Sequence, residues 1–292
     1  MKILLLGKNG QIGWELHRTL STLAEVVSLG RNELDLANFP ALRETVRAVS
    51  PQLIVNAAAY TAVDKAESEP ELAMAINGTA AGILAEEAIR CGGALIHYST
   101  DYVFDGSKTS FYVEDDSPNP INIYGKSKLA GEVAIAQSDV PHLIFRTSWV
   151  YGTRGRNFLL TILRSAKEKP ELKIVNDQIG APTWSRALAE ATAQIIAMCC
   201  SPSTGCAGIK EKSGIYHMTA AGQTSWYGFA EAILGTKAEA MPKPRLLAIP
   251  TVDYPTPATR PAYSVLNNDK IEKTFAIKLP DWQWQLKMAL DA

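Results

Sequence analysis

Cysteine and histidine are scarce in this sequence, and its charges nearly cancel. Its 292 residues include four cysteines and four histidines, and neither type shows the short paired spacing of a zinc site. With 29 basic and 30 acidic residues, the formal net charge is -1, which gives no electrostatic footprint for nonspecific binding to nucleic acid or an anionic membrane. These scarcities argue against a metal-binding domain and a polyanion-binding protein, and they predict cysteines that stay reduced.

Long hydrophobic runs are also missing. The first apolar run follows Lys2 and ends at Gly7, which is too short for a signal peptide, and no later segment approaches the ~20 apolar residues of a membrane span. We therefore expect a cytoplasmic protein with no membrane partner. In such a protein the glycosylation sequon Asn77-Gly78-Thr79 has no expected role. At about 150 residues per domain, the length allows one large domain or two ordinary ones.

The first half alternates short apolar runs with amphipathic stretches, which is typical of repeated βαβ units around a parallel sheet. Near-continuous apolar strands suit a sheet that is covered on both faces. The pattern predicts an α/β protein with a Rossmann-type, doubly wound parallel sheet. The expected strands are Lys2–Leu6, Val26–Leu29, Leu53–Asn56, Ala94–Tyr98 and His142–Arg146, and the expected helices cover roughly residues 11–22, 39–49, 71–91 and 123–137.

The second half has a looser rhythm and ends in a proline-rich stretch. It predicts a helix near 157–168, a strand at 172–175, a helix at about 185–198 and a small-residue loop at 201–213. Six prolines lie between Pro242 and Pro261, and proline lacks the amide donor of a central strand or helix. We expect a smaller, loop-rich C-terminal substrate domain over the carboxyl ends of the strands. The predicted Rossmann domain is 1–146 plus roughly 171–199, and the predicted substrate domain is roughly 147–170 plus 200–292.

A glycine-rich turn follows the first strand and leads directly into a helix. Its spacing is G-x-x-G-x-x-G, and glycines let a pyrophosphate approach the amide groups of a helix N-terminus. A merely structural turn is the alternative. The residues expected to bind the cofactor here are Gly7, Asn9, Gly10, Gln11, Ile12 and Gly13.

Cofactor preference is expected at the end of the second strand, where an acidic residue would hold a ribose and an arginine would accept a 2′-phosphate. Arg31 favours NADPH, whereas the nearby Glu33 and Asp35 leave NADH open. Small residues after the third strand would let the cofactor lie close to the backbone, although a packing turn explains them too. The further expected cofactor contacts are Arg31, Asp35, Leu36, Ala57, Ala58, Ala59 and Tyr60.

Tyr124 and Lys128 are four residues apart on a predicted helix, so both side chains can reach one pocket. A nearby cation favours phenolate, and we therefore expect Lys128 to lower the pKa of Tyr124 and to bind the nicotinamide ribose. A tyrosine tuned in this way suits a general acid that acts on a ketone. Taken alone, the pair could also be two surface residues.

The fourth strand ends in His97-Tyr98-Ser99-Thr100-Asp101, at the sheet edge where chemistry is expected. A hydroxyl from Ser99 or Thr100 could bind the substrate carbonyl, and strand register does not decide between them. A Ser-His-Asp hydrolase set is not expected, because neighbours on a strand alternate faces. His97 and His217 are expected to be core or hinge histidines.

The glycine turn, the Ser99–Asp101 strand end and the Tyr124–Lys128 pair, in this order, resemble the extended short-chain dehydrogenase/reductase superfamily. Within it, the chain resembles the dTDP-4-dehydrorhamnose reductase family over nearly its whole length. The finer resemblance rests on residues 62–67, 99–104, 146–151 and 176–183, which read AVDKAE, STDYVF, RTSWVY and NDQIGAPT, and on Arg260-Pro261.

This resemblance implies reduction of the C4 ketone of dTDP-4-dehydro-L-rhamnose by NADPH or NADH, giving dTDP-L-rhamnose for bacterial surface polysaccharides. It implies a triad of Thr100, Tyr124 and Lys128, with Tyr124 donating a proton to the C4 oxygen. It also places Trp149 against the sugar and Arg260 on the diphosphate, with an ion-paired domain clamp as the alternative for Arg260. The residues expected to bind the substrate are Thr61, Val63, Thr100, Asp101, Tyr102, Trp149, Gln178, Pro182, Thr183 and Arg260.

The sequence departs from this family at the magnesium bridge described for some of its dimers. Glu15 fits the first-helix position, but Trp184-Ser185-Arg186 supplies no second glutamate. We therefore expect no bound metal, and a monomer or homodimer. Two alternatives stay open: a noncatalytic NADP-binding regulatory subunit resembling that of methionine adenosyltransferase, and a nucleotide-sugar epimerase or dehydratase.

Overall fold

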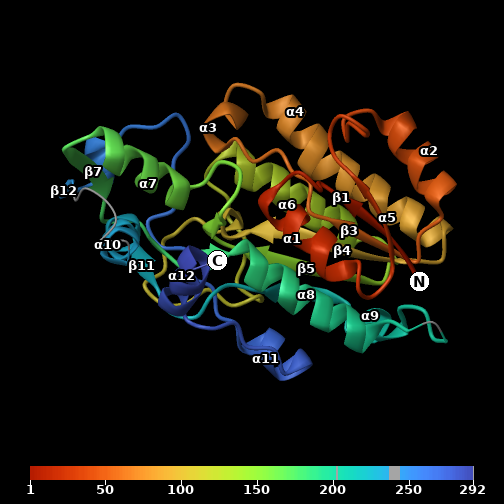
Figure 1. Cartoon of the computed structure of the whole chain (residues 1–292). Helices are drawn as coiled ribbons and strands as arrows, with labels where there is room; N and C mark the ends of the chain where they lie inside the picture. The colour runs from red at the N-terminus through yellow and green to blue at the C-terminus, as the bar shows by residue number, and fades with distance from the viewer. Residues whose placement is uncertain (202, 237–243, 292) are drawn as a thin grey trace.

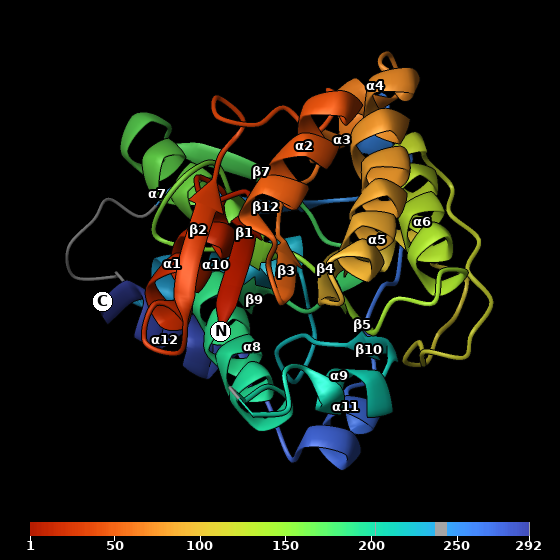
Figure 2. The same cartoon turned by 90° about the vertical axis from the view of Figure 1, so that its right-hand side faces the viewer.

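A six-stranded parallel sheet organises the chain (Figures 1 and 2). It is seen in a computed structural model that describes residues 1–201, 203–236 and 244–291. All of its neighbouring strands run parallel. The Rossmann-type, doubly wound α/β fold is therefore confirmed. The strands are β1 (Lys2–Leu6), β2 (Glu25–Leu29), β3 (Leu53–Asn56), β4 (Ala94–Thr100), β5 (His142–Thr147) and β10 (Gly214–His217), in the order β10-β5-β4-β3-β1-β2.

Alternate residues of each strand build the two layers of the sheet's hydrophobic core, one on each face. Ile3 and Leu5 belong to the core on one face of the sheet, and Leu4 and Leu6 belong to the core on the other. This division follows from the twofold side-chain period of a strand, and it explains why the strands are apolar throughout. One face is covered by α1 (Gln11–Leu20) and α8 (Ser185–Cys199), and the other by α2 (Phe39–Val49), α5 (Ala80–Arg90) and α6 (Ile123–Ala136).

Residues 70–90 form one continuous helical run in which α4 (Pro70–Met74) passes through a π-helical turn, η1 (Ala75–Thr79), into α5. By length and composition this run could cross a membrane, so the expectation that no segment approaches that length was wrong. However, 61% of its apolar stretch is buried inside the protein. Packing against the sheet explains its composition, because a helix in a protein core is apolar on most of its surface.

The π-helical turn contains Asn77, whose side chain joins the loop after β3 to α6. The Asn77 side chain accepts a hydrogen bond from the Tyr60 N–H at 2.8 Å and donates to the Tyr60 carbonyl at 3.0 Å and to Ser127 Oγ at 2.9 Å. It therefore fixes the loop after β3 against α6. Because Asn77 is only 1% exposed, the sequon is inaccessible in the folded chain.

A second core forms beside the sheet and lies at the left of Figure 1. It is rich in aromatic residues and packs Tyr151, Trp184, Phe229 and Trp282 together. The sequence predicted α7 and β7 but not the later helices or β12, and of these only β12 lies in the proline-rich stretch. The elements here are α7 (Phe158–Glu168), β7 (Glu171–Val175), α10 (Trp226–Thr236), β12 (Arg245–Ile249) and α12 (Trp282–Asp291).

The remaining described elements are short, apart from one further helix of seven residues, α11. Pro242 lies outside the described residues, and the prolines at 244 and 250 flank β12 rather than interrupt the central sheet. These elements are α3 (Val63–Ala66), η2 (Asp101–Val103), β6 (Val150–Tyr151), β8 (Ile179–Gly180), β9 (Thr183–Trp184), α9 (Ala207–Glu211), β11 (Thr224–Ser225), η3 (Thr251–Asp253) and α11 (Asp269–Phe275).

Two strand pairings bear on the expected domain division. β10 was assigned to the substrate domain, but it pairs with β5 as the edge of the large sheet. β7 was assigned to the Rossmann domain, but it pairs with β12 outside that sheet. Neither pairing can be read from local periodicity, because each joins segments about 70 residues apart. We therefore propose a division that exchanges these two strands.

The expectation of fully reduced cysteines was also wrong, because Cys200 and Cys206 form a disulfide. Cys91 and Cys199 are free. The sequence showed the adjacent pair Cys199-Cys200 but no signal for which thiol would face Cys206. The difference comes from α8, in which Cys199 is the last residue and is buried in the core.

A buried carboxylate on α5 predicts an acid-sensitive contact with α2. Glu87 is fully buried and bonds Arg43 and Arg47, which hold the pKa of Glu87 to about 2, below its usual value of 4.5. Its contribution to stability is therefore present above pH 4.5 and is lost as the pH falls toward 2. Chemical unfolding should show a smaller difference between wild type and Glu87→Gln at about pH 2 than at about pH 7. An equal difference at both pH values would contradict this assignment.

Candidate active site

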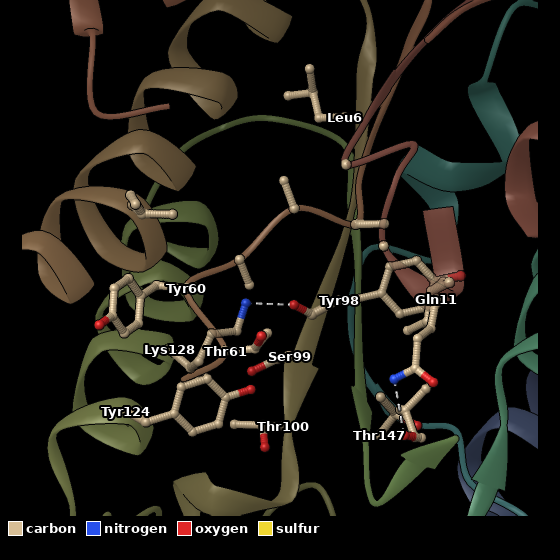
Figure 3. Close-up of a pocket in the computed structure, with 18 of the residues that line it drawn as sticks. Leu6, Gln11, Tyr60, Thr61, Tyr98, Ser99, Thr100, Tyr124, Lys128 and Thr147 are labelled. Atoms are coloured by element: carbon tan, nitrogen blue, oxygen red, sulfur yellow. Dashed lines mark hydrogen bonds between the residues drawn. The ribbon is translucent and has the colours of Figure 1, made fainter. Parts of the chain in front are cut away.

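A cavity of about 750 Å³ lies at the carboxyl ends of the central strands (Figure 3). The chain moves from β1 outward to β2 and returns to β3 on the other side of β1, so the cavity sits at the topological switch point where such sheets bind ligands. Its walls contain most of the expected site residues. These are Gly7, residues 9–12, Arg31, Asp35, Leu36, residues 57–61, Val63, residues 100–102, Tyr124, Lys128 and Trp149.

The glycine turn brings two loops into contact at one end of the cavity. Gly7 has a φ of 88°, and a Cβ there would lie 2.7 Å from the Ala58 nitrogen. Gly13 is outside the cavity wall, where a Cβ would lie 2.0 Å from the Gly7 oxygen, so it permits packing of the helix on the turn. No side chain caps α1 at Gly10, which leaves its first N–H groups available to an anionic group.

Near the end of β2, Arg31 and Asp35 line the cavity, whereas Glu33 does not. Glu33 lies outside the lining, where it is paired with Lys8 and accepts a hydrogen bond from the Gly30 N–H at 2.7 Å. Asp35 does line the cavity, but its Oδ1 accepts a hydrogen bond from the Ala37 N–H at 3.0 Å. One charge of each sign, from Arg31 and Asp35, therefore lines this end of the cavity.

Three buried polar atoms of the cavity wall have no hydrogen-bond partner among the described residues. They are Ser99 Oγ on β4, Thr147 Oγ1 on β5 and Asp101 Oδ2 in η2. A buried hydroxyl without a partner costs free energy unless a ligand or water satisfies it. A glycine turn at one end, a cation beside it and unsatisfied hydroxyls further in are the features that fit a nicotinamide dinucleotide.

Tyr124 is positioned by the first turn of α6. Asn122 caps this helix by accepting a hydrogen bond from the Gly125 N–H at 2.8 Å. A Cβ on Gly125 would lie only 2.1 Å from the Tyr102 oxygen, so glycine allows α6 to approach the end of β4. The Tyr124 ring then packs edge-on against Tyr102, with 5.7 Å between centroids. Figure 3 shows its hydroxyl directed toward Ser99 and Thr100.

The pKa of Tyr124 is raised to about 12, so its expected lowering was wrong for this structure. Burial is the main cause, the Asp101 carboxylate adds to it, and a hydrogen bond with Thr100 opposes it. Thr100 also donates to Asp101 Oδ1 at 3.0 Å, and burial raises the pKa of Asp101 to about 7. At neutral pH the Tyr124 phenol is therefore protonated, which is the state that a proton donor requires.

Lys128 is almost fully buried behind this group. Its Nζ donates to the Tyr98 carbonyl at 2.6 Å and lies 3.0 Å from His97 Nε2. Burial lowers the pKa of Lys128 to about 8, and Glu132 partly opposes this effect. His97 is buried as expected, but its contact with Lys128 was not foreseen from the sequence.

The opposite wall is made by two stacked indoles. Trp149 and Trp226 lie parallel, with 3.5 Å between ring centroids, and both line the cavity. Trp149 has a φ of 46°, which is uncommon for a residue with a side chain. It also packs on Gly180, where a Cβ would lie 2.4 Å from the indole. The expected sugar contact is therefore half of an aromatic pair whose other indole, Trp226, packs against the aromatic core beside the sheet.

Four expected substrate contacts lie outside the cavity wall. Gln178 accepts a hydrogen bond from the Trp226 indole at 3.2 Å, and Pro182 is buried. Thr183 Oγ1 accepts a hydrogen bond from the Ala220 N–H. Arg260 is paired with Asp64 at 2.9 Å, which is the clamp considered as its alternative. Their contacts with substrate stay predictions.

Sequence analysis missed several residues of the wall. Thr147 and Ser148 directly follow an expected strand, so their position at the sheet edge was a usable signal. Trp226 carried no such signal, because it reaches the cavity only through packing of α10 in the second core. The other unforeseen residues are Leu6, Leu29, Gly30, Leu34, Ile76, Tyr98, Val150, Gly155 and Arg156.

Among the described residues, no cluster of three or more His, Cys, Asp or Glu side chains could hold a metal ion. Glu15 instead lies 3.9 Å from Arg18 on its own helix. The expectation of no bound metal stays a prediction.

Comparison with known proteins agrees with this geometry. The family model for the RmlD substrate binding domain matches residues 1–292. The dTDP-4-dehydrorhamnose reductase of Burkholderia thailandensis is 50% identical over 295 residues, covering 99% of this chain and 98% of that protein. The structure of a dTDP-4-dehydrorhamnose reductase from Clostridium acetobutylicum is 36% identical, with a TM-score of 0.91, and the match covers 100% of this chain and 99% of that one.

A second solved structure carries a cofactor. The dTDP-4-dehydrorhamnose reductase of Bacillus anthracis, solved in complex with NADP, is 33% identical with a TM-score of 0.90, and the match covers 99% of this chain and 98% of that one. Full-length matches to a family model, to relatives and to structures exclude a likeness confined to the Rossmann fold. The chain belongs to the dTDP-4-dehydrorhamnose reductase family of NADP-dependent oxidoreductases.

Proposed function

We propose that this enzyme reduces the C4 ketone of dTDP-4-dehydro-L-rhamnose to dTDP-L-rhamnose, with NADPH as the preferred reductant and Tyr124 as the proton donor. The observation that carries the proposal is the protonated Tyr124 phenol beside Thr100, inside a cavity that fits a nicotinamide dinucleotide. Membership of the reductase family supports the choice of substrate. The product would supply polysaccharide biosynthesis in the cytoplasm. The enzyme would act as a monomer or a homodimer.

The cofactor, when bound, supplies the hydride that a ketone needs at carbon. The protein's residues position the reactants and supply the proton. The α1 N-terminus and the Gly7 turn would hold the pyrophosphate, and Arg31 would hold a 2′-phosphate. Because Glu33 is engaged by Lys8 and Gly30, Arg31 is the group that supports NADPH over NADH.

At the other end, Thr100 and Tyr124 would hold the ketone oxygen by hydrogen bonds. As negative charge develops on this oxygen, Tyr124 transfers its phenolic proton to it and becomes a phenolate. Solvent then returns a proton to Tyr124, so each turnover consumes one hydride and one proton. Trp149 would offer an apolar surface to the deoxyhexose, and its stacking on Trp226 would hold that surface in place.

The test is to mix the purified protein with NADPH and dTDP-4-dehydro-L-rhamnose. We expect loss of the reduced-nicotinamide absorbance and formation of dTDP-L-rhamnose, identified by NMR. Cofactor binding without any consumption would support a noncatalytic regulatory protein and refute the reductase. Protein that retains stoichiometric nucleotide and transforms the sugar without added reductant would support an epimerase or dehydratase.

A further inference from the structure

Lys128 is backed by a chain of three hydrogen-bonding groups. Asn56 and His97 are paired neighbours on β3 and β4. Asn56 Nδ2 lies 3.0 Å from His97 Nδ1, and His97 Nε2 lies 3.0 Å from Lys128 Nζ. All three residues are at most 1% exposed. Water therefore cannot reach these three groups to compensate for two donors that face each other.

The hydrogen bond between Asn56 and His97 determines which nitrogen of His97 carries the proton. The Ala58 N–H donates to Asn56 Oδ1 at 3.2 Å, so the amide of Asn56 turns its NH2 group toward His97. His97 is neutral, because complete burial holds the pKa of His97 well below its usual value of 6.5. A neutral imidazole has one acceptor nitrogen and one N–H. Since Nδ1 accepts from Asn56, Nε2 carries the proton.

This proton points at Lys128 Nζ, and an ammonium group cannot accept it. A lysine ammonium has three donors and no lone pair, whereas an uncharged amine has one lone pair. The amine would donate to the Tyr98 carbonyl at 2.6 Å and accept from His97 Nε2 at 3.0 Å, so no donor in the series faces another donor.

We propose that Asn56 and His97 form a positioning pair that presents an N–H to Lys128 Nζ and favours its uncharged amine over the ammonium in the unliganded protein. This inference rests on the proposed function, because Lys128 lines the cavity proposed to hold the cofactor and the substrate. To take up a proton, Lys128 Nζ must instead face a lone pair on His97 Nε2. His97 then carries its proton on Nδ1, and the Asn56 amide turns to accept it. That turn releases the Ala58 N–H, which belongs to the cavity wall.

Other charged and titratable groups also lie near Lys128. Glu132 on the same helix favours the ammonium, but Arg146 binds its carboxylate in two places. Tyr124 is one turn earlier on α6, and Asp101 follows β4. Burial lowers the pKa of Lys128 to about 8, in the direction that the hydrogen-bond geometry requires.

The test uses NMR of the full-length, unliganded protein with 15N-labelled histidine and 13Cε-labelled lysine. At pH values above the Lys128 midpoint, we expect His97 to be neutral with its proton on Nε2, and we expect this proton to move to Nδ1 as Lys128 becomes charged. A proton on Nδ1 throughout the titration would overturn the inference. This measurement needs no variant, so it decides the question even where a substitution prevents folding.

A variant gives an independent result. His97→Gln places an amide oxygen near the position of Nε2, where it can accept from an ammonium, so the Lys128 midpoint should rise by about one pH unit or more. The matched control is His142→Gln on β5, where His142 Nδ1 lies 2.9 Å from the Val140 carbonyl. An unchanged midpoint in His97→Gln would overturn the inference. Failure of the wild type to reduce the ketone would refute the proposed function and leave the His97 result standing.

Discussion

Tyr124→Phe should lower kcat by about 10²- to 10⁴-fold while leaving NADPH affinity nearly unchanged. The substitution removes only the phenolic oxygen, which is the proposed proton source, and it keeps the ring that packs on Tyr102. The expected loss is in kcat rather than KM, because the proton is transferred in the transition state. Steady-state kinetics and fluorescence titration with NADPH would measure the two effects separately.

Tyr216→Phe is the matched control for this experiment. Tyr216 also loses one hydroxyl, which donates to the Lys212 carbonyl at 2.8 Å, but it is not part of the cavity wall. Its kcat should stay close to that of wild type. Near-normal turnover in Tyr124→Phe would refute the assigned role, and loss of NADPH binding would show that the substitution disturbs the cavity itself.

Arg146→Met should lower the free energy of unfolding by about 3–5 kcal/mol. Arg146 and Glu132 are each 2% exposed at the side chain, and the guanidinium binds both carboxylate oxygens, with the shortest contact at 2.7 Å. Removing the arginine leaves a carboxylate buried between β5 and α6 without its partner. Urea unfolding followed by circular dichroism would measure the loss.

Two further variants separate this cause from a loss of packing. The double variant Glu132→Gln and Arg146→Met removes the unpaired charge, so it should recover most of the stability. Arg186→Met breaks the exposed pair with Glu190 and should cost at most about 1 kcal/mol. A double variant as unstable as Arg146→Met would show that volume and shape, rather than charge, decide the cost.

Local patterns in the sequence predicted the sheet well and its far edge poorly. β1, β3 and α2 have the predicted bounds, because an apolar run or a capped amphipathic stretch defines each of them. β10 and the pairing of β7 with β12 were missed, because they depend on contacts between distant segments. The same limit applies to the disulfide, since the choice of Cys200 over Cys199 follows from the last turn of α8.

The cavity residues that follow strands or share a helix face could be predicted, but their electrostatics could not. The spacing of Tyr124 and Lys128 placed both at one cavity, yet Lys128 Nζ contacts His97 and the Tyr98 carbonyl. The pKa of Tyr124 is raised because burial outweighs the hydrogen bond with Thr100. Burial and hydrogen-bond direction are tertiary properties, so a motif alone does not reveal them.

The most direct test of the central claim is a crystal structure of the complex with NADP and dTDP-L-rhamnose. We expect the C4 hydroxyl oxygen of the sugar to lie about 2.6–3.2 Å from the Tyr124 hydroxyl, next to Thr100, with C4 facing the nicotinamide ring. A sugar bound with C4 directed away from both Tyr124 and the nicotinamide would contradict the account.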